Sequence, residues 1–121
     1  MAPIDRPDRA AAVVAERAAV ADRVAALARQ VDDLAEQQAH TTHDDEHDPE
    51  GVTIGYERAH LRALLASARQ ELDDLDRAAA RLAAGRYGRC VRCGAAIAEE
   101  RLDALPAVET CIACTTPRRR R

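Results

Sequence analysis

Apolar residues recur at regular intervals along the first half of the chain. From residue 13 to residue 34 the successive intervals are 7, 4, 3, 4 and 3 residues, which is the spacing of a coiled-coil seam on one side of a helix. Pro7 suits the first turn of such a helix. The pattern therefore predicts a long helix whose seam is formed by Val13, Val20, Val24, Leu27, Val31 and Leu34.

The second half repeats this pattern. Intervals of 4, 3, 4, 3, 4 and 3 separate the apolar positions from residue 61 to residue 82, and Ile54 lies one heptad earlier. Gly85 follows as a natural C-cap, because glycine readily adopts the left-handed conformation that often ends a helix. A second long helix is predicted, with its seam at Leu61, Leu65, Ala68, Leu72, Leu75, Ala79 and Leu82.

The two seams match each other when the chain folds back on itself. Six pairs of seam residues then face each other, and the residue numbers of each pair sum to 95 or 96. An antiparallel hairpin requires this constancy, and its centre falls at Asp48. Each helix has about 30 residues and a length of roughly 45 Å. The pairs are Leu34 with Leu61, Val31 with Leu65, Leu27 with Ala68, Val24 with Leu72, Val20 with Leu75 and Val13 with Leu82.

The predicted turn is the most polar stretch of the chain. Five acidic residues lie within residues 44–50, and like charges crowded at a turn repel each other. Two interpretations stay open: a solvated turn in which Asp48 and Pro49 start the second helix, or a functional acidic probe. The histidines at positions 40, 43 and 47 have helical spacing and form a second metal candidate with Asp44, but exposed histidines near a turn are usually solvated.

Composition favours helices with a thin core. The 121 residues include no Trp, no Phe and only two Tyr, so the large side chains that normally fill a globular core are missing. Charge is unevenly distributed. Residues 1–85 carry 10 Arg against 17 acidic residues, giving −7, whereas residues 86–121 carry 8 Arg against 4 acidic residues, giving +4. No run of 18 apolar residues exists, so a membrane span is not expected.

The four cysteines form two pairs, Cys90-x2-Cys93 and Cys111-x2-Cys114, with seventeen residues between the pairs. This spacing is typical of a tetrahedral zinc site, in which each CxxC loop presents two thiolates to one ion, and Gly94 fits the tight turn of the first loop. A disulfide framework is the alternative, but nothing resembling a secretory signal peptide opens the chain. Four sulfur ligands leave no open position for a substrate or water, so one structural Zn²⁺ is predicted. Reduced cysteines and the lack of an export signal predict a cytoplasmic location.

These patterns together predict a mainly α protein: a long antiparallel two-helix coiled-coil hairpin followed by a small C4 zinc finger. The expected domains are the hairpin at 1–85 with an acidic tip at about 41–52, the finger at 86–114, and a basic disordered tail at 115–121, where Pro117 and a run of like charges oppose order. An enzyme is not expected, since no Ser/His/Asp set, phosphate loop or open metal site is visible.

The cysteine-bearing segment resembles a known family. Over roughly residues 45–114, the finger, the preceding helix and the acidic turn resemble the DksA/TraR group of bacterial transcription regulators. The resemblance implies a regulator that docks on RNA polymerase and inserts its coiled coil into the secondary channel, without reading DNA sequence. Asp45 and Asp48 are then the functional tip residues near the active centre. The motif residues are Tyr87-Gly88, Cys90-x2-Cys93-Gly94, Ile97, Arg101-Leu102, Pro106 and Cys111-x2-Cys114.

The chain departs from the family pattern at three places. Asp45 and Asp48 have the spacing of the family's tip residues, but Pro49 follows where the family has alanine. Members that respond to guanosine tetraphosphate carry basic residues where this chain has Leu105 and Thr115, so the usual alarmone site is not expected. The helix that follows the finger in longer members is replaced by the basic tail.

Two other classes of function stay open. One is a zinc-finger protein that makes weak contacts with nucleic-acid phosphates through its arginine tail, although the rest of the chain is acidic. The other is an adaptor that binds a partner helix through its coiled coil. Arg86, Tyr87 and Arg101 either contact the polymerase or serve as ordinary surface and finger packing. The tail arginines are Arg118, Arg119, Arg120 and Arg121.

Overall fold

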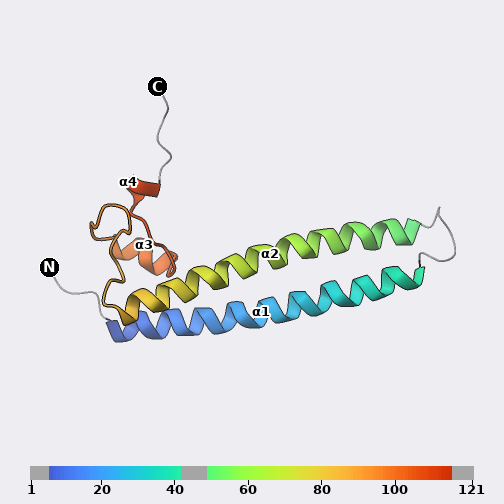
Figure 1. The fold of residues 1–121 in the computed structure, drawn as a ribbon, viewed down its shortest axis with the longest axis horizontal. Helices are drawn as coiled ribbons and strands as arrows, with labels where there is room; N and C mark the ends of the chain where they lie inside the picture. The colour runs from blue at the N-terminus through green and yellow to red at the C-terminus, as the bar shows by residue number, and fades with distance from the viewer. Residues whose placement is uncertain (1–5, 42–48, 116–121) are drawn as a thin grey trace, which may run out of the picture. The chain divides into compact units, whose positions relative to one another are not determined.

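The computed structural model describes residues 6–41 and 49–115. Over these residues the chain forms four helices and no strand, and one isolated antiparallel bridge joins Arg89 to Ala96. None of the helices in these two ranges is long and apolar enough to cross a membrane. The predicted fold class is confirmed, since two long helices pack together and the cysteine-bearing segment follows (Figure 1). The helices are α1 (Arg6–Thr41), α2 (Pro49–Ala83), α3 (Glu99–Ala104) and α4 (Ile112–Thr115).

The chain divides into two compact units. One unit contains residues 19–70, and the other contains residues 1–18 together with residues 71–121. Both α1 and α2 therefore contribute to each unit. The cysteine-bearing segment belongs to the unit that holds the first turns of α1 and the last turns of α2.

In the unit of residues 19–70, α1 and α2 pack side by side through the predicted seam. Arg58 Nη1 donates to Gln38 Oε1 at 3.0 Å, and the two residue numbers sum to 96, as the predicted register requires. Val31 and Leu65, predicted to face each other, are both buried and line the same surface hollow. The buried seam residues of this unit are Val20, Val31, Ile54, Leu65 and Ala68.

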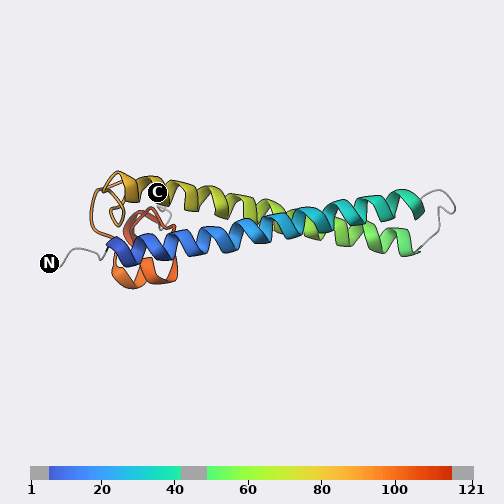
Figure 2. The same ribbon diagram turned by 90° about the horizontal axis from the view of Figure 1, so that it is seen from below.

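In the other unit, the first turns of α1 lie beside the last turns of α2 in both ribbon views (Figure 2). Val13 and Leu75 from the predicted seam are almost completely buried here. Arg17 pairs with Asp76 across the two helices. Ala78, which the seam does not include, is also fully buried. The seam prediction is thus confirmed in this unit but incomplete.

The end of α2 sets the direction in which the cysteine-bearing segment begins. Gly85 has φ +74, and its N–H donates to the carbonyl of Leu82 at 3.2 Å. The N–H of Arg86 donates to the carbonyl of Arg81 at 2.8 Å. This pair of bonds is a Schellman motif with glycine at its left-handed position. The prediction that Gly85 caps the helix is confirmed.

Candidate metal centre

The structure brings all four cysteines together. Their Sγ atoms lie within 4.8 Å of one another, and those of Cys93 and Cys111 are 3.8 Å apart. A tetrahedral ion with Zn–S bonds of about 2.3 Å requires sulfur atoms about 3.8 Å apart. No pair is a disulfide. The donor set and its spacing therefore fit one tetrahedral metal ion, which the two CxxC pairs would hold.

The first cysteine pair sits in a tight turn held by backbone hydrogen bonds. The N–H of Gly94 donates to the carbonyl of Cys90 at 2.9 Å, and the N–H of Cys90 donates to the carbonyl of Ala95 at 2.8 Å. Gly94 has φ +79, a conformation that favours glycine over residues with a side chain. Arg92 N–H points to the Cys90 sulfur at 3.4 Å. The loop thereby directs two sulfur atoms to one point.

The second pair sits at the start of a helical turn. α4 follows Cys111 directly, and the N–H groups of Cys114 and Thr115 donate to the carbonyl of Cys111 at 3.1 and 2.9 Å. This turn places the Cys114 sulfur on the same side as that of Cys111. The N–H of Val91 donates to the carbonyl of Glu109 at 2.9 Å, so the two cysteine loops are also joined through their backbones.

The backbone around Cys90 favours the thiolate form of this residue. Hydrogen bonds from backbone N–H groups, chiefly that of Cys111, lower the pKa of the Cys90 thiol to about 6. The Cys114 thiol hydrogen-bonds to the Cys90 sulfur, which raises the pKa of Cys114 to about 12. A divalent cation bound by the four sulfur atoms would take the place of these protons, because metals bind the thiolate form.

A small apolar core supports the metal centre. Ile97 and Leu102 are almost completely buried, and Tyr87 is buried with its hydroxyl donating to the carbonyl of Pro106 at 2.7 Å. Burial raises the pKa of Tyr87. The Ile97 N–H donates to the Gly88 carbonyl at 2.8 Å. These contacts position the chain between the two cysteine pairs. A core of this size is too small to hold the segment folded alone, so a metal ion is expected to add to its stability.

Charged side chains attach the finger to the helices of the same unit. Arg9 on α1 bonds to Asp103 on α3 at 2.6 Å. Arg81 on α2, whose side chain is only 9% exposed, donates to the carbonyl of Val108 at 3.2 Å and lies 3.6 Å from Glu109. The finger is therefore held on both long helices by arginines that reach across to it.

The predicted contact residues around the finger have different surroundings. Arg101 donates from Nε to the carbonyl of Thr110 at 3.0 Å and from Nη2 to Thr115 Oγ1 at 2.9 Å, so it holds the second cysteine loop in place. Tyr87 is core packing, as described above. Arg86 is exposed. Asp45 and Asp48, the predicted tip residues, lie outside the residues that the structure describes.

Sequence reasoning missed the attachment role of Arg9 and Arg81. A signal was present, because residues 86–121 carry only four acidic residues. Three of these, Glu99, Asp103 and Glu109, pair with helix arginines in the structure. The few acidic residues in this basic segment therefore indicated ion pairs with arginines from another part of the chain.

The metal centre also has a counterpart among known families. Residues 85–120 match the family model described as the prokaryotic dksA/traR C4-type zinc finger. This segment is a DksA/TraR-type zinc finger. The predictions of this finger type and of a site for one zinc ion formed by four cysteines are thereby confirmed. The match covers the finger and the residues after it, not the two long helices.

Beyond the DksA/TraR-type finger, the fold resembles that of a solved structure. It is described as the "Structure of transcription factor DksA2 from Pseudomonas aeruginosa", with a TM-score of 0.74 and 23% sequence identity. The likeness covers 90% of this chain and 78% of that one. At this identity the likeness shows a similar fold, with a helical hairpin and a finger, and carries no conclusion about function. No curated protein matches the chain.

Proposed function

We propose that this chain is a transcription regulator that binds RNA polymerase and inserts the acidic end of its helical hairpin into the secondary channel. The zinc finger is structural and lies at the base of the hairpin. The observation that carries the proposal is the DksA/TraR-type finger at residues 85–120, joined to two long helices in a fold shared with a transcription factor.

The chemistry of the chain supports a regulator that acts through binding and through the charge of its tip, and not through catalysis at the metal. The four cysteine sulfurs would fill a tetrahedral coordination sphere, which would leave the metal no position for a substrate. Asp45 and Asp48 belong to a stretch with five acidic residues in residues 44–50. Carboxylates placed beside the metal ions and nucleotides of a polymerase active centre would change the charge there, because such ions prefer oxygen ligands. We assign these two residues an electrostatic role.

Binding to the polymerase can be tested without DNA. The purified, zinc-loaded chain should be retained by immobilised core RNA polymerase at low salt and should compete with another factor that enters the secondary channel. Absence of binding under these conditions would refute the proposal. Retention by bare DNA that is lost steeply as salt rises would favour the alternative of a phosphate-binding zinc finger instead.

A second experiment separates docking from the action of the tip. Asp45→Asn combined with Asp48→Asn should keep polymerase binding within about twofold, since exposed charges contribute little to affinity, but should abolish the effect on transcription. The matched control is Asp33→Asn combined with Asp73→Asn, which removes the same charge from exposed positions on α1 and α2. If both double variants changed transcription equally, net charge and not the tip would be responsible.

A further inference from the structure

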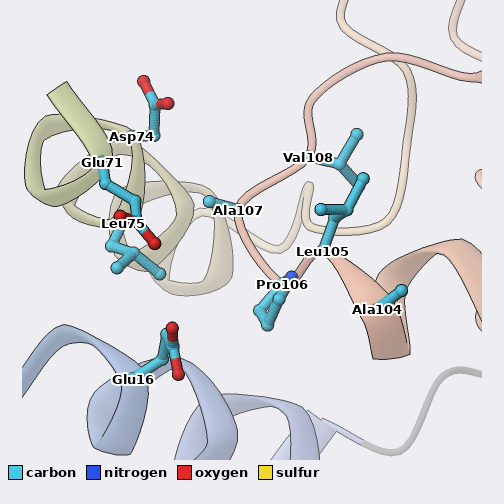
Figure 3. Close-up of a pocket in the computed structure, with 9 residues that line it drawn as sticks. All are labelled: Glu16, Glu71, Asp74, Leu75, Ala104, Leu105, Pro106, Ala107 and Val108. Carbon is cyan, nitrogen blue, oxygen red and sulfur yellow. The ribbon is translucent and has the colours of Figure 1, made fainter. Parts of the chain in front are cut away.

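A hollow lined by three arginines lies where α2 ends and the first cysteine loop begins. It has a volume of about 370 Å³. Arg81 belongs to the last turns of α2, whereas Arg86 and Arg89 belong to the segment that follows Gly85. The hollow shares no lining residue with the pocket drawn in Figure 3, which contains Leu105. Its lining is completed by Cys90, Val91 and Gly94.

Carboxylates balance the positive charge at this hollow only in part. Among the described residues, no acidic side chain lines it. Arg81 Nη1 lies 3.6 Å from Glu109, but a second arginine of α2 also bonds to that carboxylate. Arg89 donates from Nη1 to the carbonyl of Gly94 at 3.0 Å. The exposed side chain of Arg86 has no hydrogen bond or ion pair within residues 6–41 and 49–115. Two of the three guanidinium groups therefore lack a carboxylate partner in this part of the chain.

Arg81 also carries a donor that the described part of the chain does not use. Its side chain is only 9% exposed, and its Nε atom is buried without a hydrogen-bond partner in the two described ranges. Its other nitrogens are directed to the carbonyl of Val108 and to Glu109. A buried donor without an acceptor costs free energy. Because Arg81 lines the hollow, an anion held there would bring oxygen acceptors to this side chain.

A phosphate anion has the chemistry that these arginines favour. Its oxygen atoms accept several hydrogen bonds at once, and guanidinium groups bind them in bidentate geometry. A dianion also interacts more strongly than a single negative charge with two cations that have no carboxylate partner. No aromatic ring, amide or carboxylate is among the described side chains of the lining. The hollow therefore attracts the charge of a ligand and offers little to a nucleoside.

We propose that Arg81, Arg86 and Arg89 form a binding site for a small inorganic phosphate anion beside the metal centre. The site does not depend on RNA polymerase, so its failure would leave the proposed regulator untouched. Four thiolates around a divalent ion carry a net charge of about −2, and Cys90 lines the hollow. The competing explanation is that the arginines only balance this charge. The two explanations differ in whether phosphate binds.

Nuclear magnetic resonance of the zinc-loaded full chain tests the site. Titration with sodium phosphate should shift the backbone amide signals of residues 86–94 saturably, and sodium chloride at the same ionic strength should not. Arg86→Gln should weaken phosphate binding about fivefold, since one exposed guanidinium contact is lost. This variant should keep its zinc content, because the side chain has no described partner to lose. Guanosine monophosphate should bind no more tightly than phosphate.

The matched control is Arg92→Gln. Arg92 is exposed and lies in the same cysteine loop, but it does not line the hollow. The control removes the same charge near the metal and should bind phosphate as the unmodified chain does. Absence of saturable shifts in the unmodified chain would overturn the proposal in favour of charge balance, and so would equal weakening by Arg86→Gln and Arg92→Gln. Tighter binding of guanosine monophosphate than of phosphate would overturn the assignment to an inorganic anion.

Discussion

Gly85 shows how one residue without a side chain decides where α2 ends. Its φ of +74 lies in the left-handed region, and a Cβ placed there would meet nothing within 4 Å. The cost of Gly85→Ala is therefore a cost of the backbone alone, roughly 1–2 kcal/mol of unfolding free energy. Thermal unfolding followed by circular dichroism should show a lower melting temperature for this variant.

Gly55→Ala provides the comparison for this substitution. Gly55 lies inside α2 in an ordinary helical conformation, and its added Cβ would meet only the end of the Gln38 side chain, at 3.2 Å. Alanine is favoured over glycine inside a helix by about 1 kcal/mol, so this variant should be as stable as the unmodified chain or more stable. Equal destabilisation by both substitutions would contradict the role assigned to the φ of Gly85.

Arg81 shows what apolar periodicity cannot predict. Its side chain is buried because the finger covers it, and its Nε atom has no hydrogen-bond partner among the described residues. A charged residue is rarely buried without a partner, and here the partners, Val108 and Glu109, follow it by 27 and 28 residues. A pattern read along one helix holds no information about such a distant segment.

At the scale of helices, the regular intervals predicted the packing of α1 on α2 well. The seam and the register follow from a repeat of 3.5 residues, and a contact such as Gln38 with Arg58 has the predicted sum of residue numbers. Ala78 was missed because the seam assumes that each helix has a single neighbour. α2 has two neighbours within residues 71–83, since its last turns also carry the finger.

The four cysteine ligands were predictable from spacing, because metal coordination restricts residue type and interval strongly. The residues that surround the metal site were less predictable from the sequence. Arg101, with its bonds to Thr110 and Thr115, was predicted as a contact residue or as packing, and sequence alone left that choice open. The acidic tip and the division into a hairpin at 1–85, a finger at 86–114 and a tail at 115–121 stay predictions.

Metal removal should unfold the finger selectively. Binding of structural zinc contributes on the order of 10 kcal/mol, most of which is folding energy. A strong chelator should therefore abolish the protection of amides in residues 86–114 against hydrogen exchange. Mass spectrometry measures this exchange. The unit of residues 19–70 has its own buried seam, so its amides should keep most of their protection.

Cys93→Ser should reproduce the effect of the chelator. Ala113→Ser is its control, because it places a hydroxyl between the ligands of the second pair without removing a sulfur. The prediction fails if the finger keeps its protection without metal, or if residues 19–70 lose theirs together with it. The second outcome would mean that the two units unfold as one.

At the scale of the whole chain, charge separates along the sequence. Residues 1–85 have a net charge of −7, from 10 Arg and 17 acidic residues, and residues 86–121 have +4, from 8 Arg and 4 acidic residues. In the unit that holds the finger, carboxylates of α1 and α2 line the same surface hollow as Leu105, whose side chain is exposed. The positions that the resemblance to the DksA/TraR group would require to be basic for a highly negative ligand are uncharged here, at Leu105 and Thr115.

This charge distribution predicts that guanosine tetraphosphate has no effect on the protein. The nucleotide carries several phosphate charges, which the uncharged side chains of Leu105 and Thr115 cannot neutralise. Transcription assays with the chain and RNA polymerase should give the same result with and without the nucleotide. Leu105→Arg combined with Thr115→Lys adds the two missing cations. The control, Leu64→Arg combined with Thr53→Lys, adds the same charges at exposed positions of α2. Any response to the nucleotide that the first variant gains should exceed that of the control. A change in transcription when the nucleotide is added to the unmodified chain would contradict this prediction.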